Sequence, residues 1–317
     1  MKLAIVILNW NGKNDTQACL ASLPKGLLTI VIDNGSTDGS IETLQRQFPE
    51  IVVIPTGKNL GYAGGNNVGI QYALNQDADL ILLLNNDTLV DPTSISALIE
   101  ETQLSPHVGI FGAYPLRMSE PAKLDHLGGI WNPQTASFHL IGLGESDGFR
   151  TNKSLDYVCG CSILIRRSVF EAIGFFEEKF FLFWEEADFC MRAKKAGFGI
   201  EVCYAARLYH KVSASFIGGN PHKTYFWWRG RCLWIERNCS LQEKKHLFKT
   251  ILFPEILHLF KLRFIKNVEL FLLKLLNKKD LSQKKSKLLQ YRSAIQGYAD
   301  YNKKKFGNSP SWIYKRA

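Results

Sequence analysis

The first hundred residues alternate short, continuous apolar runs with longer segments of mixed polarity. The apolar runs predict four strands, at residues 3–8, 28–32, 51–54 and 80–84. The segments between and after them predict four helices, at residues 14–23, 40–48, 63–74 and 94–103. Runs without polar alternation are typical of strands buried on both faces. The pattern therefore predicts an α/β fold, with a mostly parallel sheet and helices on both of its faces.

A long glycine-rich stretch, residues 112–155, interrupts this alternation. It is too long for an ordinary connection in a compact domain, which predicts an irregular, functional loop. Beyond it, residues 158–166 predict a strand and residues 168–173 a helix. A further helix is predicted at residues 187–196, ended by Gly197.

The character of the chain changes after residue 215. Residues 225–229 are aromatic and basic, and residues 254–277 are rich in Leu, Ile and Phe, with charges at near-helical steps. The latter pattern predicts an amphipathic helix with a wide apolar face. The Lys-rich residues 278–317 are predicted to be helical as far as Gly307. We therefore predict a catalytic domain at 1–215 and a basic, aromatic and amphipathic helical extension at 216–317.

The net charge of +10 is unevenly distributed. Residues 1–215 carry 17 Lys and Arg against 23 Asp and Glu, and residues 216–317 carry 22 against 6. Such asymmetry predicts an acidic catalytic body and a basic part that meets an anionic surface. The basic residues lie among apolar ones and form no nucleic-acid-binding motif, so we expect no nucleic acid as partner.

The cysteines and the apolar runs indicate the cellular compartment of the protein. The seven cysteines are an odd number, and no second close pair complements Cys159 and Cys161 as a zinc site would require. We therefore predict reduced core thiols in a cytosolic protein. No run reaches the ~20 apolar residues of a membrane span, and residues 3–8 are followed by polar residues rather than a cleavage site.

Polar clusters follow several of the predicted strands. Asn9, Asp33, Asn59 and Asp87 each come after an apolar run, so they should converge at the carboxyl edge of the sheet, where ligands bind. Asp87 is a hard oxygen ligand suited to Mg²⁺ or Mn²⁺, and one carboxylate suffices when substrate phosphates add further ligands. The residues around Asp33 are also typical of a simple turn. The glycines that follow Asn59 match neither a dinucleotide fingerprint nor a Walker loop.

A second acidic segment, Glu185-Glu186-Ala187-Asp188, follows Trp184, and His210 lies beyond it. Glu186 could accept a proton from a hydroxyl nucleophile, or it could simply begin a helix. His210 could be a metal ligand or a packed side chain. Together with Asp87, these residues suggest metal-assisted transfer of a phosphate-activated group.

An ordered set of motifs resembles family 2 inverting glycosyltransferases, whose fold is the Rossmann-like GT-A fold. The matching segments are Ile7–Gly12, Val31–Ser40, Asn59–Asn67, Leu84–Thr88, Asp156–Gly160, Phe181–Arg192 and His210. The chain looks most like the bacterial rhamnosyltransferase group, with relatives among galactofuranosyltransferases. The resemblance covers about residues 1–215.

The resemblance implies a role for each matching position. The nucleotide-sugar donor would contact Asn9, Asn11, Asp33, Asn59, Gly61, Asn66 and Asn86. Asp87 and His210 would bind Mg²⁺ or Mn²⁺, and Glu186 would be the catalytic base. Trp184, Glu185 and Asp188 would lie near the acceptor or support the base. In two places the chain departs from the family pattern: Asn85 replaces the first acid of the Asp-x-Asp metal motif, and Glu186 stands where Asp is usual.

The implied reaction is inverting transfer of a sugar to a hydroxyl of a saccharide or lipid-linked acceptor, in the synthesis of a cell-surface polysaccharide. The best donor is dTDP-L-rhamnose, with a UDP-sugar for galactosyl or galactofuranosyl transfer as the alternative. The enzyme would be cytoplasmic, at the inner face of an anionic membrane, and a homo-oligomer is left open. From other classes, the alternatives are a non-enzymatic anionic-surface binder and a nucleotide-binding dehydrogenase, the latter disfavoured because no Gly-x-Gly-x-x-Gly follows the first strand.

Overall fold

The computed structural model describes residues 1–211, 221–276 and 281–314. The chain forms two compact units. The first comprises Met1–Trp131, Phe138–Glu178 and Glu185–Val212, and the second comprises Asn132–Ser137, Lys179–Trp184 and Ser213–Ala317. The domain boundary predicted after residue 215 lies outside the described residues.

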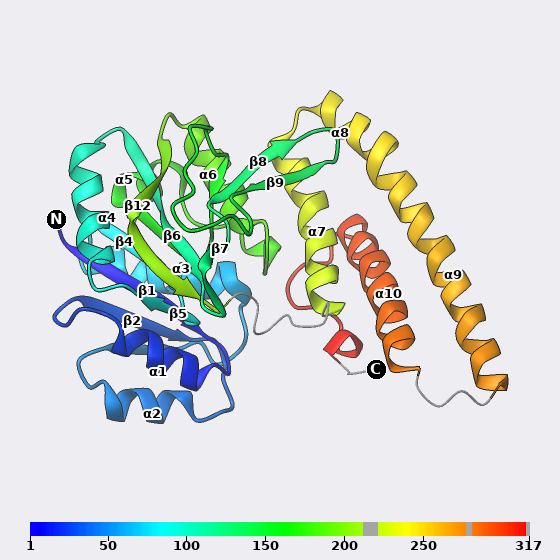
Figure 1. Ribbon diagram of the computed structural model, residues 1–317, viewed down its shortest axis with the longest axis horizontal. Helices are drawn as coiled ribbons and strands as arrows, with labels where there is room; N and C mark the ends of the chain where they lie inside the picture. Colours follow the sequence, from blue (N-terminus) through cyan, green and yellow to red (C-terminus); the bar gives the residue numbers. More distant parts are fainter. Residues whose placement is uncertain (212–220, 277–280, 315–317) are drawn as a thin grey trace. The chain divides into compact units, whose positions relative to one another are not determined.

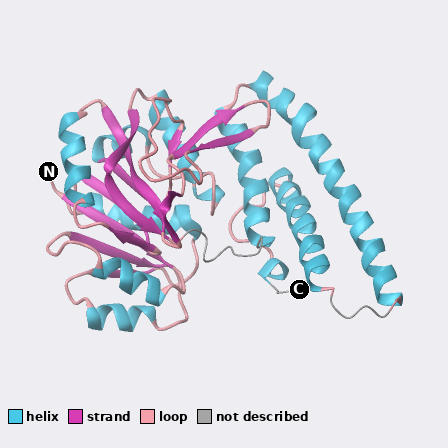
Figure 2. Ribbon diagram, in the orientation of Figure 1, coloured by secondary structure: helices cyan, strands magenta, loops and turns pink. Residues whose placement is uncertain are grey.

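The first unit is built on one large mixed sheet with the strand order β3-β2-β1-β4-β11-β6-β12-β5, and β7 pairs with β6 (Figures 1 and 2). Its strands are β1 (Leu3–Asn9), β2 (Leu28–Asp33), β3 (Val52–Pro55), β4 (Leu80–Asn85), β5 (Thr88–Val90), β6 (Val108–Arg117), β7 (Glu120–Leu124), β11 (Ser162–Arg166) and β12 (Gly199–His210). The first four sequence-predicted strands are confirmed and pair in parallel. Beyond β4 the sheet is mixed, because β11 runs antiparallel to both β4 and β6.

The predicted helices of this unit are confirmed to within a few residues. They are α1 (Lys13–Ala21), α2 (Ser40–Gln47), α3 (Gly61–Asn75), α4 (Ser94–Leu104), α5 (Arg167–Ile173) and α6 (Glu185–Lys195), with a 3₁₀ turn at Glu178–Phe180. The side chains of β1 are buried on both faces of the sheet from Leu3 to Ile7, as the unbroken apolar run predicts.

Glycines let α3 pack directly on β1. A Cβ at Gly65 would lie 2.3 Å from the Leu8 side chain, and one at Gly69 would lie 2.3 Å from Val6. No side chain fits at that separation, so the glycines inside α3 have a packing reason. Gly61, at the start of the helix with φ of 77°, remains a predicted donor contact.

The prediction of an irregular loop over residues 112–155 is wrong for residues 112–141, whereas residues 142–155 do lie outside the strands and helices. The stretch contains most of β6, all of β7, and two strands of a second sheet, β8 (Gly128–Asn132) and β9 (Ser137–Ile141). The third strand of that sheet is β10 (Tyr157–Val158), and the strand order is β10-β8-β9. Some glycines of the stretch mark close packing, whereas Gly144 and Gly148 have positive φ in the irregular segment. At Gly112 a Cβ would lie 2.6 Å from Val158, on the neighbouring segment.

Two further strands differ from the prediction. The single strand predicted at residues 158–166 is divided into β10 (Tyr157–Val158) and β11, with Cys159–Cys161 between them. The long strand β12 was not predicted. Its register against β6 shifts between Val202 and Arg207, and an irregular strand of this kind lacks a clean alternation in sequence.

The second unit is helical. It contains α7 (Pro221–Asn238), α8 (Leu241–Leu247), a π-helical turn (Phe248–Leu252), α9 (Phe253–Leu275), α10 (Ser282–Asn302) and a 3₁₀ turn (Ser311–Tyr314). The predicted amphipathic helix is confirmed as α9, and its predicted last residue, Asn277, lies outside the described residues. Figure 1 shows α7 and α10 side by side. Gly297 permits this approach, since a Cβ there would lie 2.3 Å from the carbonyl oxygen of Tyr225.

The short segment 179–184 packs into the core of the helical unit. Phe181 stacks on Phe226 with ring centroids 5.0 Å apart, and a Cβ at Gly230 would lie 2.6 Å from Trp184. Phe181, Phe183 and Trp184 all have positive φ, at 66°, 65° and 76°. Bulky residues adopt this conformation at a cost of about 1–2 kcal/mol each, so burial of the aromatic rings must offset the strain.

Candidate active site

The ends of β1 and β2 form the first part of the site. Asn9 and Asp33 lie opposite each other in the parallel register, and Asn9 Nδ2 donates to Asp33 Oδ2 at 2.9 Å. Both side chains are buried, and the second carboxylate oxygen of Asp33 accepts from the backbone N–H of Ser36. Asn11, with φ of 52°, accepts a bond from the Thr37 N–H. Asp33 thus fixes the turn after β2, as its turn-like neighbours suggested.

The segment around Asn59 lies next to the ends of β1 and β2. It is also held by hydrogen bonds from side-chain amides. Asn34 Nδ2 donates to Asn59 Oδ1 at 3.1 Å and to the Gly61 carbonyl at 3.0 Å. Asn66 is buried inside α3 and donates to the Tyr62 carbonyl, one turn earlier. Asn59 and Gly61 therefore border the sheet edge, whereas Asn66 bonds to its own helix.

The residues after β4 meet the end of β12. Antiparallel pairing of β12 with β5 places His210 opposite Thr88, so that His210 Nε2 lies 3.4 Å from Asp87 Oδ1. Asn86 Nδ2 donates to Thr16 Oγ1 at 2.9 Å and reaches Asn9 Oδ1 at 3.4 Å, which joins this segment to the end of β1. The pair of residues predicted to bind metal is therefore brought together.

Asp125 completes this group, and the sequence did not single it out. The Nδ1–H of His210 donates to Asp125 Oδ2 at 2.8 Å, which leaves Nε2 turned toward Asp87. A carboxylate that holds one ring nitrogen while the other faces a metal is the usual arrangement of metal-binding histidines. Carboxylate oxygen and imidazole nitrogen suit Mn²⁺ or Mg²⁺, the softer nitrogen favouring Mn²⁺. The side chains present therefore fit the expected divalent cation.

The charges of His210, Asp87 and Asp125 affect one another. Burial disfavours the charged imidazolium, but the hydrogen bonds to Asp125 and Asp87 outweigh it and raise the pKa of His210 from 6.5 to about 10. Burial would raise the pKa of Asp125, yet the bond from His210 lowers it below its ordinary value. Without a metal, the group is an imidazolium between two carboxylates.

Glu186 lies in the first turn of α6, beside the Cys159–Cys161 segment. Its Oε1 lies 3.4 Å from the position that a Cβ would take at Gly160. Its Oε2 is buried and has no hydrogen-bond partner within the described part of the chain. Burial raises the pKa of Glu186 from 4.5 to about 7, and the charge of Cys159 adds to the rise. A carboxylate with a pKa near 7 is well matched to general-base catalysis.

The other predicted residues of this segment have different surroundings. Asp188 is fully buried and accepts from Arg192 Nε at 2.9 Å, an ion pair within α6. Glu185 is buried at the start of the helix, and Trp184 packs in the helical unit. Asp188 is thus engaged in holding the helix.

A thiol–imidazole cluster lies beside Glu186, the predicted base. Cys159 Sγ is 3.5 Å from His126 Nε2 and 3.5 Å from Cys161 Sγ. The Cys161 thiol and His126 lower the pKa of Cys159 well below its usual range against the effect of burial. In turn Cys159 raises the pKa of His126 to about 9, although burial opposes this. Cys159 acts electrostatically on both His210 and Glu186, so the predicted metal ligand and the predicted base lie near the same thiol.

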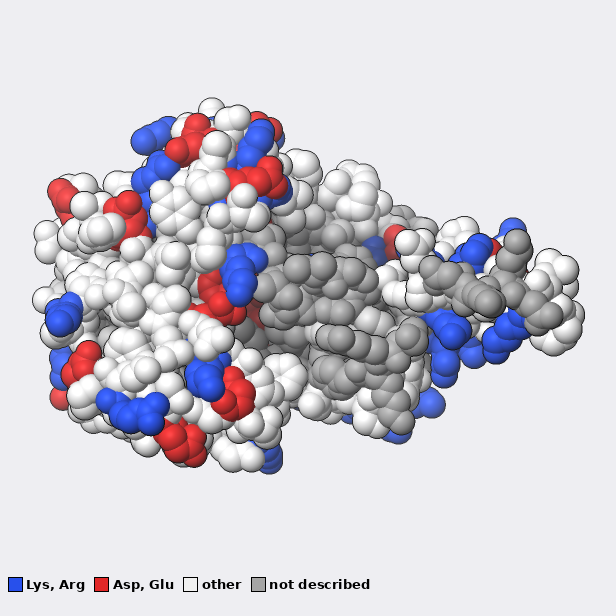
Figure 3. Space-filling view, turned by 60° about the horizontal axis from the view of Figure 1, so that its bottom comes forward, with Lys and Arg blue, Asp and Glu red and all other residues white. Residues whose placement is uncertain are grey.

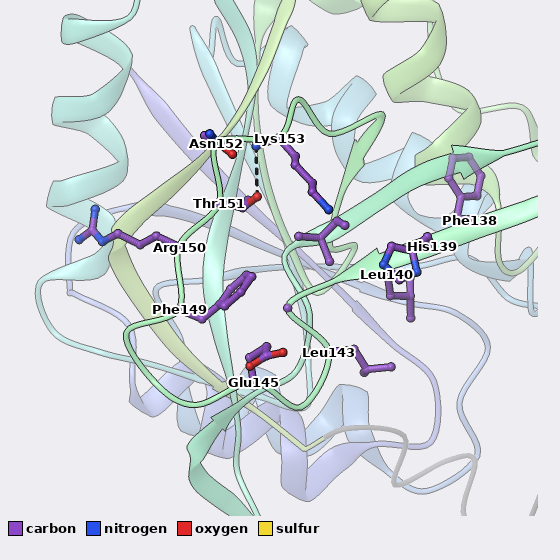
Figure 4. Close-up of a pocket in the computed structure, with 12 residues that line it drawn as sticks. Phe138, His139, Leu140, Leu143, Glu145, Phe149, Arg150, Thr151, Asn152 and Lys153 are labelled. Carbon is purple, nitrogen blue, oxygen red and sulfur yellow. Dashed lines mark hydrogen bonds between the residues drawn. The ribbon is translucent and has the colours of Figure 1, made fainter.

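A separate open groove of about 1000 Å³ is lined by Phe138–Leu143, Glu145 and Phe149–Lys153 (Figure 4). None of the predicted site residues lines it. We therefore do not assign the donor to this groove.

Comparison with known proteins identifies the family. The sequence profile described as glycosyl transferase family 2 matches residues 4–174, more than half of the chain. The chain belongs to this glycosyltransferase family. The predicted enzyme class is thereby confirmed.

Two named relatives resemble this glycosyltransferase over most of its length. N-acetylglucosaminyl-diphospho-decaprenol L-rhamnosyltransferase of Mycobacterium tuberculosis is 28% identical over 288 residues, which cover 77% of this chain and 92% of that protein. The low-salt glycan biosynthesis hexosyltransferase Agl10 of Haloferax volcanii is 29% identical over 217 residues, 66% of each chain.

Solved structures show the fold. TarS of S. aureus, residues 1–349, superimposes with a TM-score of 0.53 at 15% identity and covers 96% of this chain and 92% of its own. A mannosyltransferase from Pyrobaculum calidifontis, in complex with GDP-Man and Mn²⁺, gives a TM-score of 0.51 at 12% identity, covering 95% of this chain and 73% of its own. The glycosyltransferase therefore has the predicted GT-A fold with a C-terminal helical region.

Proposed function

We propose that this glycosyltransferase transfers L-rhamnose from dTDP-L-rhamnose to a hydroxyl of a lipid-linked saccharide, with inversion, in cell-surface polysaccharide synthesis. Two features near Cys159 support the reaction type. One is the buried Oε2 of Glu186, which has no hydrogen-bond partner within the described part of the chain. The other is the Asp87–His210–Asp125 group. The choice of rhamnose is supported by the name of the mycobacterial relative. Transfer of galactose or galactofuranose from a UDP-sugar is the second candidate.

In the proposed reaction, each of these residues has a separate role. Glu186 takes the proton from the acceptor hydroxyl, whose oxygen attacks the anomeric carbon from the face opposite the diphosphate. Asp87 and His210 would hold the divalent cation, and Asp125 keeps the proton of His210 on Nδ1, so that Nε2 is free to bind. The bound cation supplies neutralisation of the charge that develops on the leaving diphosphate.

The donor's nucleotide is expected at the edge formed by β1, β2 and α3. Asn9, Asn11 and Asp33 would line its pocket, and Asn59 and Gly61 would border the sugar nucleotide. Trp184 and Glu185 remain proposed as residues near the acceptor. This arrangement follows the rule that ligands bind beyond the carboxyl ends of parallel strands.

A nucleotide-sugar screen tests this assignment. Thermal stabilisation and slow hydrolysis would be measured for dTDP-L-rhamnose, UDP-galactose and UDP-galactofuranose, each with and without Mn²⁺. We expect the largest effect with dTDP-L-rhamnose and its loss in EDTA. Full transfer in excess EDTA would show that the site works without a metal. A preference for either UDP-sugar would instead select the second candidate.

We also propose that the helical unit contacts an anionic membrane through α9. No helix among the described residues is long and apolar enough to cross a bilayer. However, α9 exposes a row of large apolar side chains at steps of three and four, namely Phe253, Leu257, Phe260, Phe264, Val268, Phe271 and Leu275. Monomers rarely expose so long an apolar stripe without a partner.

The charge of this unit favours an anionic surface as that partner. Figure 3 shows Lys and Arg side chains gathered on the described part of the helical unit, with few acidic ones among them. Each Lys or Arg near an anionic leaflet contributes about 1 kcal/mol. A site at the inner face of the cell membrane, in the cytoplasm, would suit a lipid-linked acceptor. The competing occupant is a second copy of the chain.

Vesicle sedimentation tests the membrane contact. We expect the full-length protein to sediment with anionic vesicles at low salt, less so at high salt, and far less when Phe264→Ser and Phe271→Ser are combined. Leu104→Ser, at an apolar residue of α4 that is 72% exposed, is the matched control and should sediment normally. If the α9 substitutions left sedimentation with vesicles unchanged but dissociated a dimer of the protein, α9 would pack against a second copy of the chain instead.

A further inference from the structure

Four side chains with metal-binding atoms gather beside Glu186, and the proposed reaction leaves most of them unused. The ligand atoms of Asp125, His126 and Cys159 all lie within 4.8 Å of one another. Cys161 approaches Cys159 to 3.5 Å between the sulfur atoms. Only Asp125 has a task in sugar transfer, through its bond to His210.

The spacing of these atoms fits a tetrahedral cation. Zinc lies about 2.3 Å from sulfur and about 2.0–2.1 Å from nitrogen, so its sulfur and nitrogen ligands are about 3.6 Å apart and two sulfur ligands about 3.8 Å. In this protein Cys159 Sγ lies 3.5 Å from His126 Nε2 and 3.5 Å from Cys161 Sγ. A cation could therefore bind with side-chain adjustments of a few tenths of an ångström.

The backbone holds the ligands in place before any ion arrives. The N–H of Cys159 donates to the carbonyl of Leu127, the residue after His126. Strand β10 pairs with β8 on one side of this bond, with Val158 opposite Gly128. Ligands on fixed strands and turns lose little conformational entropy on binding. The two cysteine side chains are almost fully buried, and His126 is half-buried.

The chemistry of this donor set differs from that of Asp87 and His210. Sulfur and imidazole ligands select Zn²⁺ and its soft analogue Cd²⁺ over Mg²⁺ and Mn²⁺. A set of one sulfur, one nitrogen and one carboxylate oxygen also leaves a fourth position, which Cys161 or water can fill.

We propose that Asp125, His126 and Cys159, with Cys161 beside them, form a second metal site that binds Zn²⁺ and thereby inhibits sugar transfer. Binding would draw the Asp125 carboxylate away from His210. It would also place positive charge next to Glu186, which favours the ionised carboxylate but weakens it as a proton acceptor. The inhibition rests on the proposed function, whereas the binding itself does not.

Cadmium titration tests the binding without any sugar donor. The probe is Cd²⁺ alone, followed by its thiolate charge-transfer absorption in full-length protein. All variants carry Cys239→Ser, because Cys239 is the one cysteine of the described chain that is not buried. We expect one Cd²⁺ per chain, displaced by Zn²⁺, with the absorption lost in Cys159→Ala. His126→Gln should weaken binding by about tenfold or more.

Cys203→Ala is the matched control, because Cys203 is a buried cysteine on β12 outside the cluster. It should bind Cd²⁺ like the parent protein. An absent absorption band, or a band that survives both Cys159→Ala and His126→Gln, would overturn the site. In a separate transfer assay at fixed Mn²⁺, Zn²⁺ should inhibit the parent and inhibit His126→Gln about tenfold less strongly. Binding without inhibition would overturn only the regulatory part.

Discussion

The buried carboxyl of Glu186, the proposed base, should lower the stability of the folded protein. Its pKa is about 7 in the folded protein against 4.5 for an exposed glutamate. Between these values the folded protein holds a proton that the unfolded chain releases, so stability falls as pH rises through this window and the loss is complete above pH ~7. A difference of that size corresponds to roughly 3 kcal/mol in the free energy of unfolding.

Glu186→Gln should therefore change stability and activity in opposite directions. The amide keeps the shape of the side chain but has no charge to bury. We expect the variant to be more stable than wild type by about 3 kcal/mol near pH 8 and nearly equal to it near pH 4.5. Sugar transfer should fall about 10²–10⁴-fold because the proton acceptor is gone, with donor binding unchanged.

Urea unfolding of both proteins, at a pH below and a pH above this window, measures the stability difference, and a transfer assay measures the rate. Glu171→Gln is the control, since Glu171 forms an exposed ion pair with Arg167 and should show no comparable gain. Equal stability of Glu186→Gln and wild type at both pH values would refute the burial argument. Near-normal transfer would refute the assignment of the base and move attention to Glu185, since Asp188 is held by Arg192.

Three further predictions concern the same site. The kcat/KM of the wild type should rise with pH through about 7, as Glu186 loses its proton, and a profile that is flat between about pH 5 and 8 would contradict its role. Asp125→Asn should raise the Mn²⁺ concentration needed for nucleotide binding by about 10–100-fold, measured by calorimetry, and should add little once His210→Ala is present. Asp33→Ala should raise the KM for the donor more than it lowers kcat, whereas a pure kcat defect would exclude a role in nucleotide binding.

The sequence predicted the parallel half of the sheet because its strands are continuous apolar runs followed by polar turns. Asn9, Asp33 and Asp87 lie at the ends of these strands, and the sheet alone brings them to one edge. Strands that depend on glycine were missed. In β6, positions 109 and 112 are occupied by glycine, and Phe198 and Val158 pack where larger side chains would lie. These neighbours are distant in the sequence, so the local pattern does not reveal the packing.

Asp125 was missed for the same reason. It follows β7 in the stretch expected to be a loop. Its importance comes from the hydrogen bond to His210, which lies at the end of β12, a strand that the sequence did not predict. Cys159 and Cys161 were expected to be core thiols, and both are buried and free. Their approach to His126 depends on the pairing of β10 with β8, which no local pattern predicts.

The packing of residues 179–184 decides where this protein can be divided. Phe181 and Trp184 pack against Phe226 and Gly230, so a chain shortened at residue 215 would lose the neighbours that hold three strained aromatic residues. The backbone would then relax two residues before Glu186. A chimera that exchanges helical units between related enzymes would have to exchange residues 179–184 as well. Otherwise it would keep the large sheet but lose the packing that positions Glu186.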